Sequence, residues 1–525
     1  MRQPIRTFLI LVAVLIGIAT APLPARAGLK ADVTHGYSLI DQWRFDELTP
    51  YIETLKQKYP KSGDVTFLRA RAEFYNGDYD QAWKLLRDVD DSPAMVKKFK
   101  SLVKNTREAT RGFVTHESEH FIFYYPDGPD QVLIPFAEKA LEQSYETLGA
   151  ILKYYPHKKV RVEIYPDRTP FSRISPLTLK DIMVSGTVAL CKYNRIMLIS
   201  PGSLVRGYNW LDTLSHEYTH FLLSSKSNNN VPLWLHEGVA KYLESRWRSN
   251  EKHLSPIMET VLADGLLNDY MVELESMMPS FAKLKSAEDV QLAYAEVATM
   301  VDYMVHLKGD GAIAQLVEYL TQDRSIENAL QSLFGLTLEE FQTQWKEHMH
   351  QQKLQRIPGL TVLKFQFKKK QTDTETAAGV PPTQKAVGSP RAHDLTMLGD
   401  ILKARQFTEA AIIEYEKAIK ESRTLSPVLY NKLAATYLIN KQDRKAETLL
   451  KESLRYYPMF HTTLTHLGEV YFMRKDYPKA ERFYRQAEKI NPFNPMVHAR
   501  LITLYSAQGK TWEKENQVRL YSHIK

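Results

Sequence analysis

Apolar and small side chains recur with a fixed period in the last quarter of the chain. Positions 34 residues apart match, with Leu467, Gly468, Tyr471, Ala480, Tyr484 and Pro492 answering Leu433, Ala434, Tyr437, Ala446, Leu450 and Pro458. Leu398, Gly399 and Tyr415 mark an earlier unit, and Leu501 with Tyr505 marks a partial later one. A pattern that repeats at this length predicts stacked helical hairpins. We therefore expect an all-α array over residues 393–525.

A weaker form of this pattern occurs near the start of the chain, at residues 36–60 and 65–86. A constant offset of 432 residues places Gly36 on Gly468 and Pro60 on Pro492. Both regions resemble tetratricopeptide (TPR) repeats, although any amphipathic hairpin would place small residues similarly at the N-terminal positions. The resemblance implies TPR-like hairpins over residues 28–108. It also implies a concave surface that holds a peptide or a partner protein.

The central region has a different texture. Short alternating or apolar runs predict strands at residues 121–125, 160–165, 184–190 and 195–199. An amphipathic stretch over residues 132–154 predicts a long helix, and helical spacing returns from residue 264 to residue 350. We predict a mixed α+β domain over residues 109–352.

Residues 353–392 follow this domain. They gather Lys, Thr, Pro and Gly without a period. This composition predicts a flexible linker with no core of its own.

Residues 1–27 have the three parts of a secretory signal. Two arginines precede the apolar run 8–19, and Ala25-Arg26-Ala27 forms a cleavage site before Gly28. A helix needs about 20 apolar residues to span a bilayer. We therefore expect cleavage, with no stable membrane span afterwards, rather than retention as an anchor.

Composition narrows the class of protein further. The chain is 44% hydrophobic and 25% charged, which is typical of a globular protein. Cleavage would remove three arginines and leave a formal charge of +5 from +8. This mild charge gives no support for nucleic-acid binding. Cys191 is the only cysteine and the chain has no Asn-x-Ser/Thr acceptor, which favours a bacterial envelope, periplasmic or secreted.

The sequence His216-Glu217-x-x-His220 predicts a metal site. Histidines four residues apart on a helix project from nearly one face, where one ion can take both rings. Asn209 is placed to cap this helix. The apolar positions form a stripe on another face, Leu211, Leu214, Tyr218, Phe221 and Leu222. The histidines are therefore not core residues.

The chain contains the same pattern a second time, at His116-Glu117-x-x-His120. This copy runs directly into the alternating residues 121–125, which predict a strand. In a strand, positions i and i+4 are about 13 Å apart and cannot share one ion. We therefore expect a solvated loop and strand edge there.

A third ligand is needed, and Glu237 is the best candidate. It follows Pro232, which is tolerated in the first turn of a helix. Gly238 comes next, and glycine inside a helix suggests a close approach of another backbone. We interpret that neighbour as the helix that carries His216 and His220.

These residues together carry a family resemblance. The pattern His216-Glu217-x-x-His220 followed by Trp234-Leu-x-Glu237-Gly resembles the gluzincin metallopeptidases, and most closely the peptidase MA-like domain found with TPR repeats. The resemblance covers residues 113–350. It implies one zinc ion bound by His216, His220 and Glu237, with Glu217 as general base.

The resemblance also implies a tyrosine that supports the oxyanion, and the matching position is Tyr294. Sixteen residues separate His220 from Glu237, fewer than in the aminopeptidase branch. This difference argues against aminopeptidase specificity.

Three neighbouring residues have less certain roles in the sequence. Glu244 is either a hydrogen-bond partner of a metal ligand or the polar edge of its helix. His236 projects away from Glu237 and is interpreted as a structural or rim residue, and Cys191 as a core residue. By family analogy, residues 186–190 are the edge strand that pairs with substrate.

Two functions from different classes are compatible with these features. The first is an exported zinc metallopeptidase, which the resemblance implies is an endopeptidase, whose TPR repeats recruit a protein substrate or partner. The second is a non-catalytic envelope scaffold that binds partners through its repeats.

Overall fold

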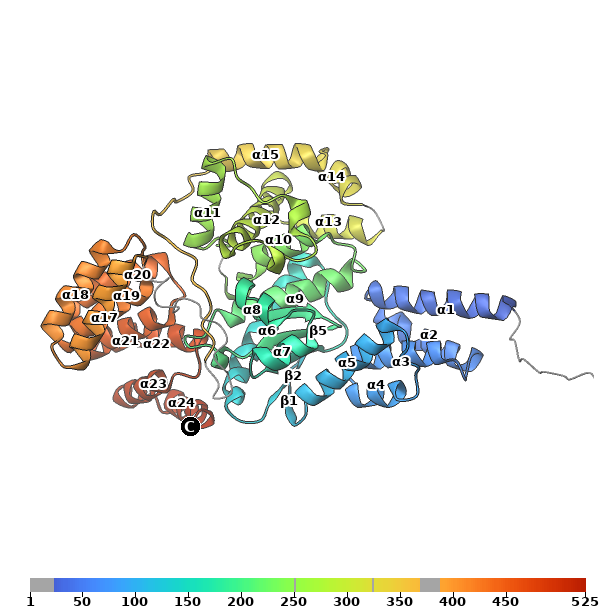
Figure 1. Ribbon diagram of the computed structural model, residues 1–525, viewed down its shortest axis with the longest axis horizontal. Helices are drawn as coiled ribbons and strands as arrows, with labels where there is room; N and C mark the ends of the chain where they lie inside the picture. The colour runs from blue at the N-terminus through green and yellow to red at the C-terminus, as the bar shows by residue number, and fades with distance from the viewer. Residues whose placement is uncertain (1–22, 250–251, 323–324, 369–387) are drawn as a thin grey trace, which may run out of the picture.

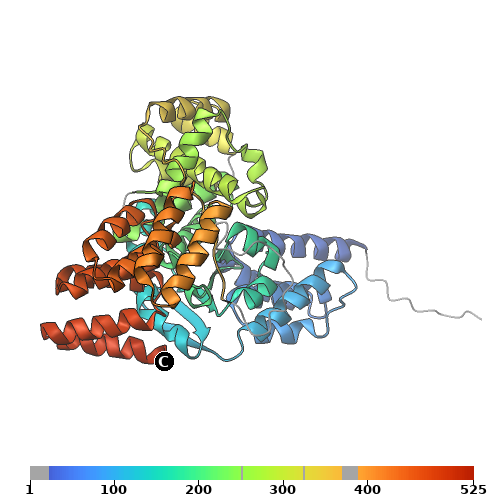
Figure 2. The same ribbon diagram turned by 60° about the vertical axis from the view of Figure 1, so that its left-hand side comes forward.

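The computed structural model describes residues 23–249, 252–322, 325–368 and 388–525. Helices from the two ends of the chain lie on different sides of a central mixed domain (Figure 1, Figure 2). Most of the expected export signal, residues 1–22, lies outside the described residues. Among the described residues, no helix is both long and apolar enough to cross a membrane.

The N-terminal region is helical. Its elements are α1 (Leu23–Asp41), α2 (Phe45–Lys58), α3 (Gly63–Asn76), α4 (Tyr79–Leu86) and α5 (Ala94–Ala109). The Ser62 and Asp78 side chains cap α3 and α4 by accepting backbone N–H groups. Between these helices, Gly77 has a φ of 85°, a left-handed conformation that glycine adopts without strain. These capping residues and Gly77 thus set the ends of α3 and α4, and the two helices coincide with the second predicted hairpin.

The central domain is built on a five-stranded sheet. Its strands are β1 (Phe113–Glu117), β2 (Phe121–Pro126), β3 (Val160–Tyr165), β4 (Ala189–Lys192) and β5 (Arg195–Ile199). The order is β1-β2-β3-β5-β4, with β2, β3 and β5 parallel and the two edge strands antiparallel. The strand predicted at 184–190 begins later, because α8 (Leu179–Ser185) covers its start.

Helices cover this sheet and extend beyond it. They are α6 (Ile134–Leu152), α7 (Arg168–Ile174), α9 (Trp210–Lys226), α10 (Leu233–Leu243), α11 (Pro256–Leu267), α12 (Ala287–Lys308), α13 (Ala312–Thr321), α14 (Ile326–Phe334) and α15 (Leu338–Gln351). One core of buried apolar side chains runs from β2 to α15. The predicted α+β class is confirmed.

Gly238 lies where α10 crosses a neighbouring helix, but that helix is not the one expected. A Cβ atom at Gly238 would lie 2.6 Å from the Val297 carbonyl oxygen on α12. The close approach is therefore to α12 rather than to α9. The interpretation from the sequence was wrong on this point, because a glycine marks a close contact without naming the partner.

The C-terminal region is an array of paired helices. They are α17 (Pro390–Ala404), α18 (Thr408–Glu421), α19 (Pro427–Ile439), α20 (Asp443–Tyr456), α21 (His461–Met473), α22 (Tyr477–Ile490), α23 (Pro495–Gln508) and α24 (Thr511–His523). Gly399 packs on the Tyr415 ring and Gly468 on the Tyr484 ring, so the repeated glycine and tyrosine meet inside each hairpin. The final unit, expected to be partial, is a complete helix pair.

The array rests on the central domain at the start of α9. The Trp210 indole N–H donates to the Lys489 carbonyl oxygen at 2.7 Å. Gly207, with a φ of 66°, lies so close to Ile490 that a Cβ atom would be 2.3 Å from its carbonyl oxygen. The first turn of α9 is therefore fixed by a residue of the array 279 positions away in the chain.

Residues 353–368 differ from the flexible linker predicted for 353–392. They pass between the central domain and the array (Figure 1). Phe367 forms a β-bridge with Leu204, and the Val205 N–H donates to the Gln366 carbonyl oxygen at 2.8 Å. Composition indicated an irregular backbone correctly but could not show that this backbone has partners. Residues 369–387 lie outside the described residues.

A buried ion network joins the N-terminal helices to the sheet. Glu163 on β3 and Arg195 on β5 are 0% and 1% exposed, and the Arg195 Nε atom lies 3.0 Å from a Glu163 carboxylate oxygen. The Tyr79 hydroxyl of α4 donates to the same carboxylate. The Arg195 guanidinium also stacks over the Phe74 ring, 4.9 Å from its centroid. Two charges inside the sheet are thus neutralised and covered by the helical region.

Candidate metal centre

Helix α9 presents two histidines as predicted. The residues of the apolar stripe are all buried, Leu211, Leu214, Tyr218, Phe221 and Leu222. His216 and His220 therefore project together from another face. The expected cap by Asn209 is not formed, since its side chain makes no hydrogen bond to the helix backbone and donates instead to Asp212 at 2.6 Å.

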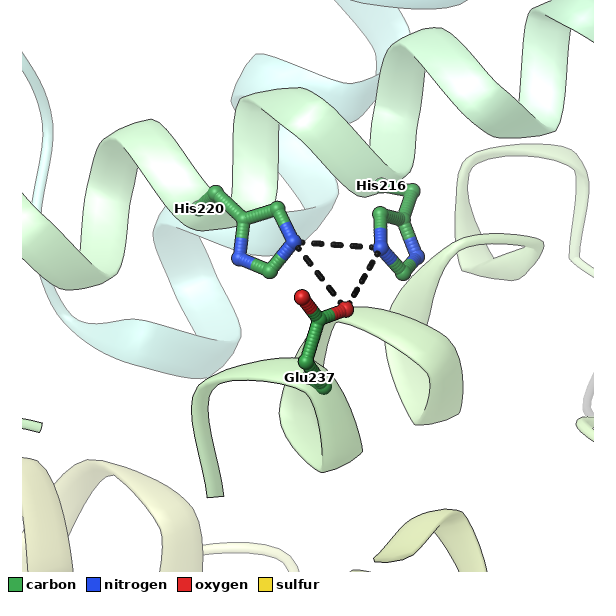
Figure 3. Close-up of side chains that lie close together, drawn as sticks. All are labelled: His216, His220 and Glu237. Atoms are coloured by element: carbon green, nitrogen blue, oxygen red, sulfur yellow. Dashed lines mark hydrogen bonds and ion pairs between the residues drawn. The ribbon is translucent and has the colours of Figure 1, made fainter. Parts of the chain in front are cut away.

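Glu237 reaches the two histidines from α10. The His216 and His220 Nε2 atoms are 3.1 Å apart, and Glu237 Oε2 lies 3.4 Å from the first and 3.5 Å from the second (Figure 3). Tetrahedral zinc with bonds of about 2.0–2.1 Å places its ligand atoms about 3.3 Å apart. Among the described residues, this is the group of side chains that could hold a metal ion.

The electrostatics of Glu237 also fit a cation. Its Oε2 atom is buried and makes no well-aligned hydrogen bond within the described structure. Burial would raise the pKa of Glu237, but the His220 and His216 rings hold that pKa well below its ordinary value. An ionised, buried carboxylate oxygen that faces two imidazole nitrogens is in the state in which a carboxylate binds a metal ion.

His216 experiences the same carboxylates. Burial lowers its pKa, but the nearby carboxylates of Glu237 and Glu244 outweigh burial and raise the pKa to about 10. A proton and a metal ion compete for the Nε2 atom. The site therefore favours positive charge at this position.

Glu217 lies beside the ligands and is 6% exposed. Burial raises its pKa, while the neighbouring His220 and His216 rings lower it. The backbone of Cys191 on edge strand β4 also lowers this pKa. Glu217 thus lies between the strand and the ligands.

Each histidine ligand has a partner at its other ring nitrogen. His216 Nδ1 lies 3.2 Å from a Glu244 carboxylate oxygen, and Lys241 forms an ion pair with Glu244. His220 Nδ1 lies 2.5 Å from His236 Nδ1. Such partners fix the tautomer and the orientation of a ligand ring.

Sequence reasoning left Glu244 open and missed the role of His236. The His236 ring stacks on the His220 ring, and its Nε2 atom lies 3.2 Å from the Ser224 hydroxyl. Burial first, and then the neighbouring His220, lower the pKa of His236 to about 3. A neutral ring in this place can accept the His220 Nδ1–H. The one sign of this role in the sequence was that His236 directly precedes the candidate ligand Glu237.

Tyr294 on α12 approaches the centre as the family resemblance implied. Its ring centroid is 6.2 Å from that of His216, in an edge-to-face arrangement. Burial raises the pKa of Tyr294 well above its ordinary value, and the carboxylates of Glu237 and Glu217 add to this effect. The hydroxyl group is therefore protonated and able to donate.

The second histidine pair is separated from this centre. His116 is on β1 and its Nε2 atom lies 2.7 Å from Glu138, whereas His120 in the following turn lies 2.6 Å from Glu142. Both acidic partners are on α6. The rings thus bind two different carboxylates. The strand expected at 121–125 is β2, whereas His116 and Glu117, which were expected in a loop, belong to the unpredicted strand β1.

A cavity of about 260 Å³ lies beside the candidate ligand His216. His216, Glu217 and Tyr294 line it on one side. Its other walls come from α8, the approach to β4, α12 and a segment beyond α15. The geometry defines a zincin-like domain with a two-histidine, one-carboxylate centre that opens into a cleft.

Comparison with known families agrees with this class. Residues 140–351 match the Peptidase MA superfamily and residues 444–495 match the tetratricopeptide repeat. The chain therefore contains a Peptidase MA superfamily domain and TPR repeats, as predicted. No curated protein matches the chain.

Solved structures show low similarity. MamA is 19% identical over 27% of this chain and 80% of its own, with a TM-score of 0.23. Native leukotriene A4 hydrolase from Saccharomyces cerevisiae is 12% identical over 77% of this chain and 67% of its own, with a TM-score of 0.32. The APC/C hetero-tetramer Cut9-Hcn1 is 11% identical over 93% of this chain and 77% of its own, with a TM-score of 0.27. Likenesses at this level carry no argument about function.

Proposed function

We propose that this protein is an exported zinc-dependent metallopeptidase of the bacterial envelope, periplasmic or secreted, whose TPR repeats recruit a protein substrate or partner. The observation that carries the proposal is the convergence of His216, His220 and Glu237 from two helices, with Glu217 beside them. The residues 1–27 support export through their sequence alone.

The residues have distinct roles in this proposal. His216, His220 and Glu237 hold the zinc ion. Zinc bound there supplies Lewis acidity, which lowers the pKa of water at its open position and polarises a peptide carbonyl. Glu217 accepts the proton of the attacking water and passes it to the leaving amine. The Tyr294 hydroxyl donates a hydrogen bond to the oxygen that gains negative charge.

The test joins zinc content to peptide hydrolysis. Purified protein should contain one zinc ion per chain and cleave unfolded casein. Glu217→Gln should retain zinc and lower kcat by about 10²–10⁴-fold, because the base is lost while the ligands remain. Glu117→Gln, in the second copy of the motif, is the matched control and should leave kcat unchanged.

Folded protein that binds no zinc, or that cleaves casein equally well after Glu217→Gln, would overturn the proposal. The non-catalytic scaffold would then be the better account. Complementation separates the two functions directly, because a scaffold would work in vivo with Glu217→Gln and a peptidase would not.

A further inference from the structure

The segment between the peptidase domain and the array, residues 359–368, is called the strap below. It lies beyond the superfamily match, which ends at residue 351. Its course between the two regions is visible in Figure 1. The strap is attached to both of them, and its middle reaches the metal centre.

One end of the strap is bonded to the C-terminal array. The Tyr457 hydroxyl accepts the Thr361 N–H at 3.2 Å and donates to the Thr361 carbonyl oxygen at 3.1 Å. The Leu425 N–H donates to the Gly359 carbonyl oxygen at 2.8 Å. A single tyrosine of the array therefore satisfies both backbone groups of one strap residue.

The other end is bonded to the loop that leads into α9. Lys368 N–H donates to the Ser203 carbonyl oxygen at 2.8 Å, and the Arg206 guanidinium donates to the Gln366 side chain at 2.7 Å. These bonds add to the bridge between Phe367 and Leu204. This end of the strap thus continues the central domain.

The middle of the strap forms a wall of the catalytic cavity. Val362, Leu363, Lys364 and Phe365 line the same cavity as His216, Glu217 and Tyr294. Phe365 is 38% exposed and faces Gly186, where a Cβ atom would lie 3.3 Å from its ring. Within the described structure, residues 362–365 make no backbone hydrogen bond. The wall is therefore held by side-chain contacts between two fixed ends.

The position of this wall gives it a consequence. Phe365 packs against Gly186, at the approach to edge strand β4, and both residues line the cavity together with Glu217. A chain that lies extended through the site advances about 3.3 Å per residue and continues on both sides of the scissile bond. A long substrate would therefore meet residues 362–365 more often than a short peptide would.

We propose that the strap selects against long polypeptides at the metal centre, and that its bond to Tyr457 makes this selection depend on the C-terminal array. The inference rests on the proposed peptidase function. A partner or substrate held by the array could thereby change access to the centre without contacting it. The array would then determine which substrates are cleaved as well as where they bind.

The experiment compares two substrates in the full-length protein, a short fluorogenic peptide and unfolded casein. Tyr457→Phe removes the hydroxyl that holds Thr361 and keeps the ring. We expect kcat/KM for casein to rise about fivefold relative to that for the short peptide, as follows from losing about 1 kcal/mol of hydrogen bonding. Tyr437→Phe is the control, because its hydroxyl bonds Glu416 within the array and does not contact the strap.

A second variant guards against an effect on folding. Gln366→Ala loosens the opposite end and should shift the substrate ratio in the same direction while zinc content stays at one per chain. An unchanged or lower casein-to-peptide ratio in both variants would overturn the inference. Wild-type protein that cleaves neither substrate would overturn the peptidase function instead.

Hydrogen exchange tests the attachment without using activity. The amide of Thr361 should exchange faster in Tyr457→Phe than in wild-type protein or in Tyr437→Phe. Equal exchange in all three proteins would show that Tyr457 does not hold the strap, whatever the enzyme does.

Discussion

The chain contains the sequence His-Glu-x-x-His twice, and the two copies have opposite fates. In α9 the histidine Nε2 atoms are 3.1 Å apart and meet Glu237. Around β1 the same spacing crosses from a strand into a turn, and each ring binds its own carboxylate on α6. The five letters are therefore compatible with a metal centre and with a simple surface contact.

The difference between the copies lies outside the motif. A buried apolar stripe makes residues 210–226 helical, and the neighbouring α10 supplies a third ligand. In the other copy, His116 and Glu117 end β1, and the chain then turns through His120 into the antiparallel β2. Metal binding thus depends on the period of the surrounding apolar residues.

The largest difference between the two copies is expected when a metal ligand is removed. Glu237→Gln should lose zinc and all measurable peptidase activity, because the negative charge at the centre disappears. His120→Ala should keep one zinc per chain and full activity. Metal analysis of both purified variants checks this, and zinc loss from His120→Ala would mean that the second copy is the metal site.

A smaller effect is expected at Tyr294. Tyr294→Phe should lower kcat about 10²–10³-fold with zinc content unchanged, since only a donor to the developing oxyanion is removed. Tyr145, which stacks on His120, provides the corresponding change in the other copy. Tyr145→Phe should leave kcat unaltered in the same assay.

The partners of the ligands should have a weaker influence still. His236→Leu should weaken zinc binding about 10–100-fold, because His220 loses the acceptor for its Nδ1–H. His236→Asn keeps an acceptor and should restore most of the affinity. Competition with a chelator measures this difference, and equal affinities for the two variants would assign His236 a packing role only.

The smallest effect concerns the second copy itself. Interactions with Ser118 and His120 lower the pKa of Glu142 despite its burial. This group therefore stabilises the fold above its unfolded pKa of 4.5, and the contribution disappears as pH falls through the lower folded value. Ser118→Ala removes the hydroxyl that donates to Glu142 at 2.5 Å, and it should reduce the free energy of unfolding by about 1 kcal/mol at pH 7 and by less at pH 4. Urea denaturation at both pH values tests this, and an equal loss would exclude the ionised Glu142 as its cause.

Local patterns predicted the parts of the centre that depend on one element. The stripe under His216 and His220 is such a pattern, and Glu237 followed from the need for a third ligand. The contact between His236 and His220 was missed, because it depends on how α9 and α10 cross. The strap was missed for a similar reason, since its partners lie on the array and in the loop before α9.

The fold could be predicted to a similar depth. Repeats predicted the array, and apolar runs predicted four of the five strands, whereas the edge strand β1 was missed. The neighbour of Gly238 was assigned wrongly because a small residue permits contact with any helix that passes. The residue pattern within one segment does not identify the distant segment against which it packs.

The network of Glu163, Arg195 and Tyr79 gives the N-terminal hairpins a second significance. A fragment that begins at residue 113 would keep every candidate ligand, yet it would expose the Arg195 guanidinium and remove the tyrosine that donates to Glu163. The hairpins and the peptidase domain thus belong to different fold classes, but the peptidase domain depends on the hairpins for its folding. In evolution, another domain could replace the hairpins only if it also supplied aromatic rings that pack against the Arg195 guanidinium.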